Sequence, residues 1–566
     1  MKRETVGGDR HQVFQPGQMI ELPKGGGYER MRSAVRLAIP EFYNFGFDEI
    51  DRRAREADKT AFIHVARSGE TISHHSFSDL AAASNRFGRV LMDLGAAKSD
   101  FAFVMISRVP AWYEVMIGCI KAGVVAMPGT NLLTAKDIEY RINKSRAKIA
   151  IVSADGADRI EAIRARCPSL EHLILIGENR PDWVTYEDAC AAVSDRLERT
   201  DAPPSRAADM MLAYFTSGTT AFAKMVPRDH GYALAHAITG RYWMDLGEDD
   251  IHWTLSDTGW AKAAWGMLFP PWLMGAAVVL YDGDPRFDAD AHLRLIGTLG
   301  VTTFCAPPTV YRVFAQAALG NYDLSSIRHS IGAGEPLNPE VMRVWKDATG
   351  TEIHDGYGQT ETINIVANMP GLTVRPGSMG RPVPGVDVDV VDDEGAPVAD
   401  GEVAHIAVRM TDPHPLGLFH GYYADAAANR QCFRHGWYFT GDTATRDADG
   451  YIWFVGRSDD IIASAGYRIS PFEVESALQQ HPAVAESAVV GKPDALRGAI
   501  VKAYVIAAPG YEPSAELEKE IQDFVKGQTA PYKYPREIEF RDALPKTVSG
   551  KIRRVELRAE AEAETR

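Results

Sequence analysis

An apolar strand leads directly into a loop of small hydroxyl residues in the stretch Tyr214-Phe-Thr-Ser-Gly-Thr-Thr-Ala-Phe-Ala-Lys224. Backbone N–H groups and side-chain hydroxyls of such a loop can surround phosphate oxygens, and Lys224 adds a positive charge. The GxxxxGK[ST] spacing of a Walker loop is absent. The stretch therefore predicts a phosphate-binding loop of a different kind, with an ordinary turn as the alternative.

On the N-terminal side of this loop, short apolar strands alternate with helical patterns. The alternation predicts layered α/β structure with largely parallel sheets. A further α/β unit is expected from the loop to about residue 370. The predicted strands are 101–106, 124–127, 149–152, 173–176 and 211–215, and a helix is predicted over 110–122.

On the C-terminal side, residues 376–456 are rich in Gly, Pro, Asp and Val, and they predict a small β-rich unit. The segment Ser470-Pro-Phe-Glu473 then predicts the start of a helix. Ser470 is expected to cap it, Pro471 to occupy its first position and Glu473 to complete a capping box.

The remaining C-terminal residues predict a compact α+β domain of about 110 residues. A second helix is expected to begin at Ser514 and to be closed by Gly527. Strands are predicted at 486–490 and 500–506.

The bulk composition is that of a soluble, globular protein of several units. The chain has 566 residues with 61 Lys plus Arg and 76 Asp plus Glu, a net charge of −15. This charge argues against broad binding to nucleic acid or membrane surfaces. The N-terminus shows no secretory signal, and the glycine- and proline-broken stretch 260–281 is a poor membrane span. A cytoplasmic location is expected, with the mitochondrial matrix as the alternative.

Three further segments place polar or small residues at the ends of predicted strands. Gly332-Ala-Gly-Glu-Pro-Leu337 carries small residues that let a flat ring approach the backbone. His354-Asp-Gly-Tyr-Gly-Gln-Thr-Glu361 ends in a carboxylate, with a β-turn and a surface Glu as the alternative. Tyr438-Phe-Thr-Gly-Asp442 carries an acid in a turn, separated from Arg457 by a predicted hairpin over 447–453.

These segments resemble, in order and spacing, the signatures of the adenylate-forming superfamily, which includes acyl-CoA synthetases, luciferases and peptide-synthetase adenylation domains. The family's loop usually has the form TSGTTGxPK. Residues 216–220 and Lys224 match it, whereas Ala221 replaces the usual Gly and Ala223 the usual Pro. If position 221 requires a positive φ, alanine costs about 1 kcal/mol there.

The resemblance covers about residues 45 to 556 and is strongest for medium-chain acyl-CoA synthetases. The segments 256–262, 376–382 and 530–536 carry this finer likeness. It implies an α/β fold with a large N-terminal domain of layered α/β subdomains plus a small β-rich unit, followed by a small mobile α+β domain. The implied boundaries are an adenylation domain over 1–456, a hinge over 457–459 and a mobile domain over 460–566.

The resemblance also implies an ATP site that uses Mg²⁺. Tyr357 is expected to stack on adenine, Thr360 to contact phosphate, and Asp442 and Arg457 to hold the ribose. Glu361 and Thr216 are the expected metal contacts. The residues expected to bind ATP are Thr216, Ser217, Gly218, Thr219, Thr220, Lys224, Gly334, Glu335, Pro336, Asp355, Gly356, Tyr357, Gly358, Gln359, Thr360, Asp442, Arg457 and Lys551.

The segment Leu544-Pro-Lys-Thr-Val-Ser-Gly-Lys551 matches the adenylation-lysine motif of the family, with a basic tail as the alternative. Lys551 is expected to bridge the substrate carboxylate and the α-phosphate, so Lys551, Thr216 and Glu361 are the predicted catalytic residues. Asp459 matches the hinge position, about which the small domain rotates between two half-reactions. Arg468 is expected to support the thioester-forming state.

Two binding sites complete the set of predictions. Coenzyme A is expected to contact Ala465, Gly466, Tyr467, Arg497 and Arg536, although the two arginines are equally well explained as solvated side chains. An apolar acyl pocket is expected to favour short, branched or medium chains. Its predicted lining is Trp243, Trp260, Lys262, Trp265, Cys305 and Gly332.

The predicted function is therefore that of an ATP-dependent acid–CoA ligase, acting as a monomer or homodimer. The alternatives are an adenylating enzyme with another acceptor, an enzyme for aromatic acids such as benzoate, a luciferase-like oxygenase, and a nucleotide-binding homologue impaired by Ala221 and Ala223. The intact Lys551, Glu361 and Asp442 favour an active enzyme.

Overall fold

The computed structural model describes residues 5–6, 20–22, 27–56, 59–216, 223–283, 286–334, 337, 339–464, 467–530, 532–546 and 552–564. Its contacts divide the chain into two compact units. Unit 1 comprises residues 1–216, 224–387 and 410–429, and unit 2 comprises 217–223, 388–409 and 430–566. The predicted fold class, a large α/β part followed by a small α+β domain, is confirmed. The predicted hinge at 457–459 remains a prediction.

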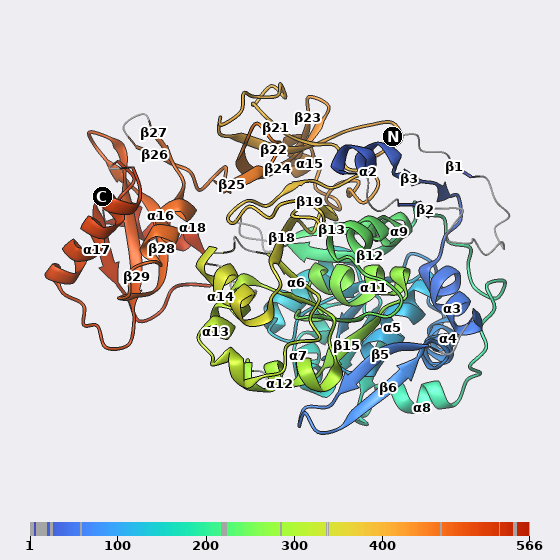
Figure 1. Ribbon diagram of the computed structural model, residues 1–566. Helices are drawn as coiled ribbons and strands as arrows, with labels where there is room; N and C mark the ends of the chain where they lie inside the picture. The colour runs from blue at the N-terminus through green and yellow to red at the C-terminus, as the bar shows by residue number, and fades with distance from the viewer. Residues whose placement is uncertain are drawn as a thin grey trace. The chain divides into compact units, whose positions relative to one another are not determined.

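The first sheet of unit 1 has seven strands and ends in an antiparallel hairpin. The two strands of this hairpin, β12 and β13, are labelled in Figure 1. Neighbouring strands of the sheet pair in parallel as far as β12, and only the last strand, β13, runs antiparallel. The strand order is β11 (Val184–Thr185), β10 (His172–Ile176), β9 (Ile149–Ser153), β7 (Phe101–Met105), β8 (Val125–Pro128), β12 (Met210–Thr216) and β13 (Lys224–Asp229).

The second sheet of unit 1 has nine strands, six of which run parallel. The carboxyl ends of these strands meet at one edge, where α/β proteins commonly bind ligands. The order is β20 (Arg381–Pro382), β19 (Asn364–Ala367), β18 (Ile353–Gly358), β17 (His329–Ala333), β16 (Thr303–Ala306), β14 (Ile251–Thr254), β15 (Ala277–Tyr281), β5 (Thr60–Val65) and β6 (Ile72–Ser76).

Two helices that pack on each other connect the sheets: α4 (Phe77–Asp93) contacts β5 and β6, and α5 (Pro110–Ala122) contacts β8. From Ala111 to the end of α5, every residue except Glu114 is buried. Pro110 starts this helix, and Gly123 ends it at φ 73°. The predicted helix over 110–122 is confirmed.

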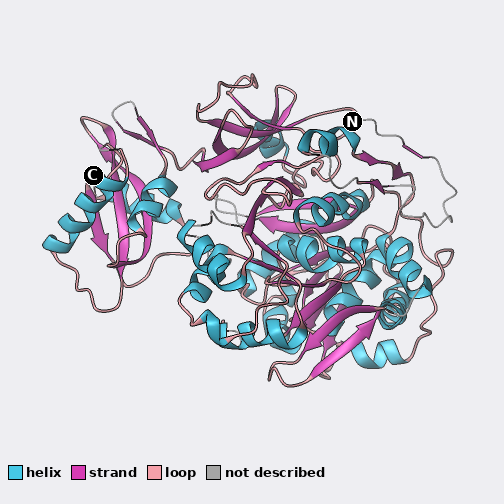
Figure 2. Ribbon diagram, in the orientation of Figure 1, coloured by secondary structure: helices cyan, strands magenta, loops and turns pink. Residues whose placement is uncertain are grey.

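Further helices cover the parallel strands of both sheets (Figure 2). The apolar core of the seven-stranded sheet includes side chains of α6 (Ala135–Ser145) and α7 (Ala154–Glu161). The core of the nine-stranded sheet includes side chains of α12 (Ala289–Leu299), α13 (Pro308–Ala315) and α14 (Pro339–Thr349).

Unit 2 contains a five-stranded β-sheet over residues 388–457, most of the range 376–456 that was predicted to be β-rich, but residues 376–387 and 410–429 of that range belong to unit 1. Its main strands are antiparallel, with β24 paired to β22 on one side and to β25 on the other. The strands are β21 (Val388–Val391), β22 (Ala404–Arg409), β23 (Phe433–Arg434), β24 (Trp437–Arg446) and β25 (Ile452–Arg457).

The C-terminal part of unit 2 has a three-stranded sheet with apolar clusters on both faces. The strands are β28 (Val484–Asp494), β29 (Gly498–Ala507) and β30 (Glu537–Phe540). One cluster includes α16 (Pro471–Leu478) and α17 (Ala515–Gln528), and the other includes α18 (Arg554–Ala563). Because side chains alternate along a strand, Val489 belongs to the first cluster and Val490 to the second.

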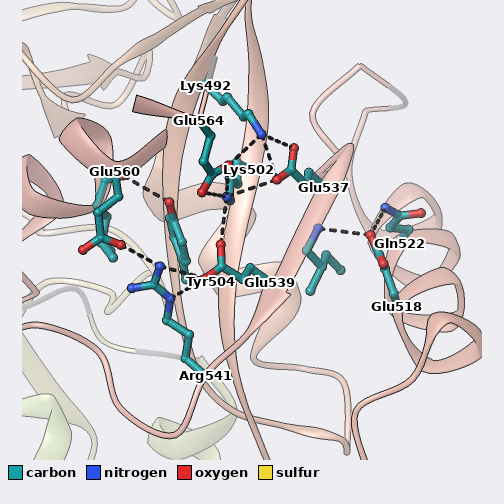
Figure 3. A network of polar contacts seen from close by, with 12 residues as sticks. Lys492, Lys502, Tyr504, Glu518, Gln522, Glu537, Glu539, Arg541, Glu560 and Glu564 are labelled. Carbon is teal, nitrogen blue, oxygen red and sulfur yellow. Dashed lines mark hydrogen bonds and ion pairs between the residues drawn. The ribbon is translucent and has the colours of Figure 1, made fainter. Parts of the chain in front are cut away.

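Ion pairs fasten both ends of α18. Near its start, Arg554 donates two hydrogen bonds from Nη2 to the carboxylate of buried Glu475, at 2.6 and 2.8 Å, and Arg558 pairs with Asp460 at 2.8 Å. Just beyond its end, Glu564 accepts hydrogen bonds from Lys492 and Lys502, each at 2.7 Å (Figure 3). Charge therefore holds the first part of α18 to α16 and Asp460, and the residue after its end to the sheet, in addition to the contacts of its apolar face.

Two details of the predicted helices are wrong. Ser470 does cap α16 by accepting a hydrogen bond from Glu473 N, but Glu473 completes no capping box. Its carboxylate instead accepts hydrogen bonds from Lys533, at 2.6 and 2.8 Å. Gly527 does not close α17, which runs through it to Gln528.

None of the helices within the described ranges combines the length and apolarity that a membrane span requires.

Candidate active site

The phosphate-binding loop predicted from the sequence falls between strands β12 and β13 of unit 1 in the chain. The last residue of β12, Thr216, pairs with the first residue of β13, Lys224, in antiparallel register. The ladder continues through Phe215 and Met225. Residues 217–222, with the predicted contacts Ser217, Gly218, Thr219 and Thr220 and the departure Ala221, lie outside the described residues.

Lys224 and Glu361 both contact the same tyrosine, Tyr422. The Nζ atom of Lys224 lies 4.8 Å from the centroid of the Tyr422 ring. The hydroxyl of the same tyrosine donates a hydrogen bond of 2.8 Å to Glu361 Oε1. Glu361 is only 7% exposed. A cation and a buried carboxylate are thus brought together from segments more than 130 residues apart in sequence.

Strand β18 and the turn after it carry the predicted adenine site. Gly356 must be a glycine, because a Cβ atom there would lie 2.5 Å from the indole of Trp243. Tyr357 and Thr360 are half-buried, and Gln359 N donates to Thr362 Oγ1 at 2.9 Å. On the neighbouring strand, Gly334 follows β17 at φ +111°, whereas Glu335 and Pro336 lie outside the described residues.

Asp355, on the same strand, is buried next to its own backbone. Its carboxylate accepts a hydrogen bond of 3.0 Å from Gly356 N. Burial raises the pKa of Asp355 to about 8, against the opposing effects of the Gly356 N–H and the Lys262 ammonium. Asp355 is therefore protonated in the folded protein at neutral pH.

Asp355→Asn is expected to remove part of the decrease in the free energy of unfolding that the wild-type protein shows as the pH rises. The folded pKa lies above the unfolded one, so the native state binds a proton that the unfolded state has released, and wild-type stability falls as pH rises from about 4 to 8. The variant should gain stability relative to wild type across this window, by up to about 1.4 kcal/mol per pH unit. Denaturant unfolding at several pH values measures it. Asp347→Asn, at an exposed ion pair, is the control, and a pH-independent gap between Asp355→Asn and wild type contradicts the prediction.

Three of the predicted acyl-pocket residues, Trp243, Trp265 and Lys262, contact one another or the strands β17 and β18. Trp243 is fully buried, donates from Nε1 to His354 O at 3.1 Å, and packs against Trp265 with ring centroids 5.5 Å apart. Lys262 lies 5.9 Å from the Trp265 ring centroid and donates to Ala333 O at 3.3 Å.

The remaining predicted pocket residues differ in position. Cys305 is fully buried on β16, and burial raises the pKa of its thiol. Gly332 lies on β17, and a Cβ atom there would approach Ile353 Cγ2 at 3.2 Å. Trp260 precedes the short helix α10 (Ala261–Ala263) and is half-buried.

In unit 2, the predicted ribose pair is directly aligned across a hairpin. Asp442 on β24 is the register partner of Arg457 on β25, and Arg457 Nη1 lies 3.3 Å from Asp442 Oδ1. Asp442 is buried, whereas Arg457 is partly exposed. The turn at Asp447 that separates the two strands agrees with the predicted hairpin.

The predicted hinge lies beside this pair. Asp459 is exposed and lies 3.6 Å from Arg457 Nε, and its backbone carbonyl accepts a hydrogen bond from Arg558 on α18. Arg468 lies in the short strand β27 (Tyr467–Ile469). Lys551 lies outside the described residues, and a backbone bridge joins Lys546 to Ile552.

The predicted coenzyme A residues occur at two places in the C-terminal part. Arg497 lies in the turn between β28 and β29, where its N–H donates to Asp494 Oδ1 at 2.8 Å. Arg536 is exposed, and its guanidinium lies 5.1 Å from the Tyr534 ring centroid. Residues 465–466 lie outside the described residues.

Tyr467 stacks on Tyr532, with ring centroids 4.0 Å apart and an interplanar angle of 16°. Both rings are exposed, at 50% and 36%. The sequence predicts neither the stacking of Tyr467 on Tyr532 nor the contacts of Tyr422 with Lys224 and Glu361. Tyr532 belongs to the segment 530–536 that carries the family likeness, so that segment offered a signal, whereas the Gly-Tyr-Tyr context of Tyr422 offered none.

Comparison with known protein families identifies the family of this chain. Residues 50–423 match the model of the AMP-binding enzymes, and residues 473–551 match that of the AMP-binding enzyme C-terminal domain. The chain therefore belongs to the AMP-binding enzyme family.

Relatives share almost the full length of the chain. The mitochondrial acyl-coenzyme A synthetase ACSM3 of Mus musculus is 41% identical over 542 residues, covering 94% of this chain and 93% of the relative. The structure of the anthranilate CoA ligase AuaEII in complex with anthranoyl-AMP has a TM-score of 0.84 at 34% identity, covering 93% and 99%. The Brucella canis acyl-CoA synthetase has a TM-score of 0.70 at 36% identity, covering 93% and 95%. The predicted class, an adenylate-forming acyl-CoA synthetase, is confirmed.

Proposed function

We propose that the protein joins a medium-chain or short branched carboxylic acid to coenzyme A in two steps driven by ATP. The first forms an acyl-adenylate and pyrophosphate, and the second transfers the acyl group to the CoA thiol and releases AMP. The observation that carries the proposal is the meeting of Lys224 and buried Glu361 on Tyr422, beside the phosphate loop. A cation and a hard carboxylate ligand are what a metal-bound triphosphate requires.

The chemistry of the first step needs positioning more than proton transfer. The substrate carboxylate is already an anion, so one of its oxygens attacks the α-phosphorus without a general base. A P–O bond to the acid forms, and the bond from the α-phosphorus to the bridging oxygen of pyrophosphate breaks. Lys224 stabilises the phosphates, and Lys551 neutralises charge on the carboxylate and the α-phosphate.

The donor set at Glu361 fits Mg²⁺. The carboxylate is buried, and one of its oxygens is oriented by the Tyr422 hydroxyl. The Thr216 hydroxyl, at the end of β12, is the second proposed ligand. When bound with ATP, the ion neutralises charge that develops on the phosphate oxygens.

Asp442 and Arg457 are the proposed ribose contacts. A carboxylate accepts hydrogen bonds from both hydroxyls of a ribose diol, and Arg457, 3.3 Å from Asp442 Oδ1, orients it. Tyr357 provides the ring on which adenine stacks. The neighbouring glycines have no side chain, so a flat ring can approach the backbone closely. The neutral Asp355 carboxyl lies on the same strand.

The second step is assigned to the C-terminal part. Tyr467, which follows the proposed CoA contacts Ala465 and Gly466 in the sequence, forms an exposed aromatic stack with Tyr532. Arg497 and Arg536 are proposed to bind CoA phosphates. Asp459 is the proposed hinge, and Arg468 the proposed support of the thioester-forming state.

The acid itself is proposed to lie against Trp243, Trp265 and Lys262, with Cys305, Gly332 and Trp260 completing the lining. An apolar pocket discriminates only about 1–3 kcal/mol per methylene, so a range of acids is expected. Aromatic acids are a second candidate class, because the two indoles offer flat surfaces and the structurally similar AuaEII is an anthranilate ligase.

We also propose the cytoplasm as the location, with the mitochondrial matrix as the alternative suggested by the names of the ACSM relatives. The protein is proposed to act as a monomer or homodimer on small molecules. Neither nucleic acid nor a membrane is a proposed partner, in keeping with a net charge of −15.

A panel of C2–C10, branched and aromatic acids tests the proposal. Each acid is incubated with the protein, ATP and Mg²⁺, with and without CoA, and pyrophosphate and acyl-CoA are measured. Acid-dependent pyrophosphate release is expected, with thioester formed only when CoA is present. Silence with every acid, persisting after Ala221→Gly, would overturn it. Transfer of the acyl group to an amine or a carrier protein rather than to CoA, with release of AMP, would favour another acceptor.

A further inference from the structure

One aromatic ring connects the two groups to which the proposed function assigns the triphosphate and its metal. Tyr422 comes from residues 410–429, a segment distant in sequence from both Lys224 and Glu361. Its hydroxyl reaches Glu361 Oε1 at 2.8 Å, and its face receives the Lys224 ammonium at 4.8 Å from the centroid. The negative face of the ring attracts the cation, while the O–H orients the anion.

The backbone of Tyr422 is held in place on both sides. Its N–H donates to Asn429 Oδ1 at 2.7 Å, and Asn429 Nδ2 donates back to the Tyr422 carbonyl at 3.1 Å. The next residue, Tyr423, donates its N–H to Met225 O at 2.9 Å. Tyr422 is therefore fastened directly beside the strand that begins with Lys224.

Glu361 is equally constrained through its own backbone. Its carbonyl accepts hydrogen bonds from Arg228 Nη1 at 2.7 Å and from Phe419 N at 2.8 Å. The Phe419 ring meets the Tyr422 ring edge-on, with centroids 4.9 Å apart. With the backbone fixed, the bond from Tyr422 constrains the Oε1 atom of the Glu361 carboxylate.

We propose that Tyr422 is a positioning residue that aims the Glu361 carboxylate at the divalent cation of metal–ATP and holds Lys224 beside it. This proposal rests on the proposed function. The hydroxyl acts on the metal through Glu361, whereas the ring acts on the phosphates through Lys224. The two actions are separable, because phenylalanine keeps the ring and loses only the O–H.

The test separates metal binding from nucleotide binding. Mn²⁺ replaces Mg²⁺ as the probe, and its binding to the protein–ATP complex is followed by the loss of the free-ion EPR signal. Tyr422→Phe is expected to weaken Mn²⁺ binding about 10-fold, as loss of a partner behind a metal ligand does. Binding of ATP in EDTA, measured by calorimetry, should stay at the wild-type value and thereby report an intact fold.

A second variant tests the ring. Tyr422→Leu is expected to weaken Mn²⁺ binding to the same degree and also to weaken ATP binding in EDTA by about 2- to 5-fold, through the lost cation–π contact. Tyr423→Phe makes the same chemical change one position along and serves as the matched control. It should match wild type in both measurements.

Glu361→Gln separates the proposed role of Glu361 as a metal ligand from the proposed role of Tyr422 as a positioning residue. If this variant binds Mn²⁺ as wild type does, Glu361 is no metal ligand, and that part of the proposed function falls. If Glu361→Gln loses Mn²⁺ while Tyr422→Phe retains wild-type affinity, only the positioning role of Tyr422 is overturned.

Discussion

Replacing Lys551 by alanine is expected to slow acyl-adenylate formation by about 10²–10³-fold, the usual loss for one preorganised charge at a reacting centre. The lysine is proposed to neutralise the carboxylate and the α-phosphate only while the new P–O bond forms. Thioester formation from a supplied acyl-adenylate and CoA should therefore keep the wild-type rate. Single-turnover measurement of each half-reaction tests both statements.

The same segment provides the control for Lys551. Lys546 pairs with Glu486 at 2.8 Å and forms the backbone bridge to Ile552. Lys546→Ala removes a positive charge five residues away and is expected to change either half-reaction by less than about 3-fold, since the ion pair is partly exposed. Equal losses in the two variants would show that only the basic character of the segment matters. Equal losses of both half-reactions in Lys551→Ala would contradict a role confined to adenylation.

Lys502→Met is expected to destabilise the C-terminal part by about 1.5–3 kcal/mol, because three partly exposed carboxylates lose their hydrogen bonds to one buried ammonium. The Lys502 side chain is 1% exposed and pairs with Glu537 at 3.1 Å, Glu539 at 2.8 Å and Glu564 at 2.7 Å (Figure 3). Lys492 and Arg541 remain as partial substitutes. Hydrogen exchange of the β29 amides reports the loss for this part alone.

The effect of Lys502→Met should depend on pH. Lys492 and Lys502 lower the pKa of Glu537 and hold that of Glu564 at about 2, and Lys502 and Arg541 lower the pKa of Glu539. Since these folded values lie below the unfolded ones, the stabilisation is complete above about pH 4.5 and is lost as pH falls through the folded values. The difference in free energy of unfolding between the wild type and Lys502→Met should therefore become smaller at acidic pH.

The matched control for Lys502 is Lys519→Met on α17. Lys519 forms an exposed i,i+4 pair with Asp523 at 3.2 Å, and such pairs contribute about 0.3–0.5 kcal/mol. A loss for Lys502→Met no larger than that for Lys519→Met would mean that the glutamate cluster is solvated and contributes little.

The sequence predicts best the features that local patterns encode. The helix from Pro110 and the strand that ends at Thr216 follow from apolar periodicity and flanking turns. The alignment of Asp442 with Arg457 follows from a single hairpin turn between them. In each case the residues that determine the structure are close neighbours in the chain.

Features that depend on distant partners could not be predicted. Glu473 leaves its expected capping box because Lys533, 60 residues away, offers a stronger charge-assisted bond. Tyr422 stands in a segment with no motif of its own, and only the fold brings it to Lys224 and Glu361. Polar contacts across such separations carry no periodic signal in a single sequence.

The antiparallel pairing of Thr216 with Lys224 has a consequence for how the phosphate loop can vary. Successive side chains of a strand point to opposite faces, so removing or adding one residue between these two would turn Lys224 away from Tyr422. Exchanging one residue type for another leaves the register intact. Ala221 and Ala223 are exchanges of this kind, and the spacing from Thr216 to Lys224 equals that of the family signature. A substitution in this loop therefore keeps Lys224 on the face that meets Tyr422, whereas a change of loop length would not.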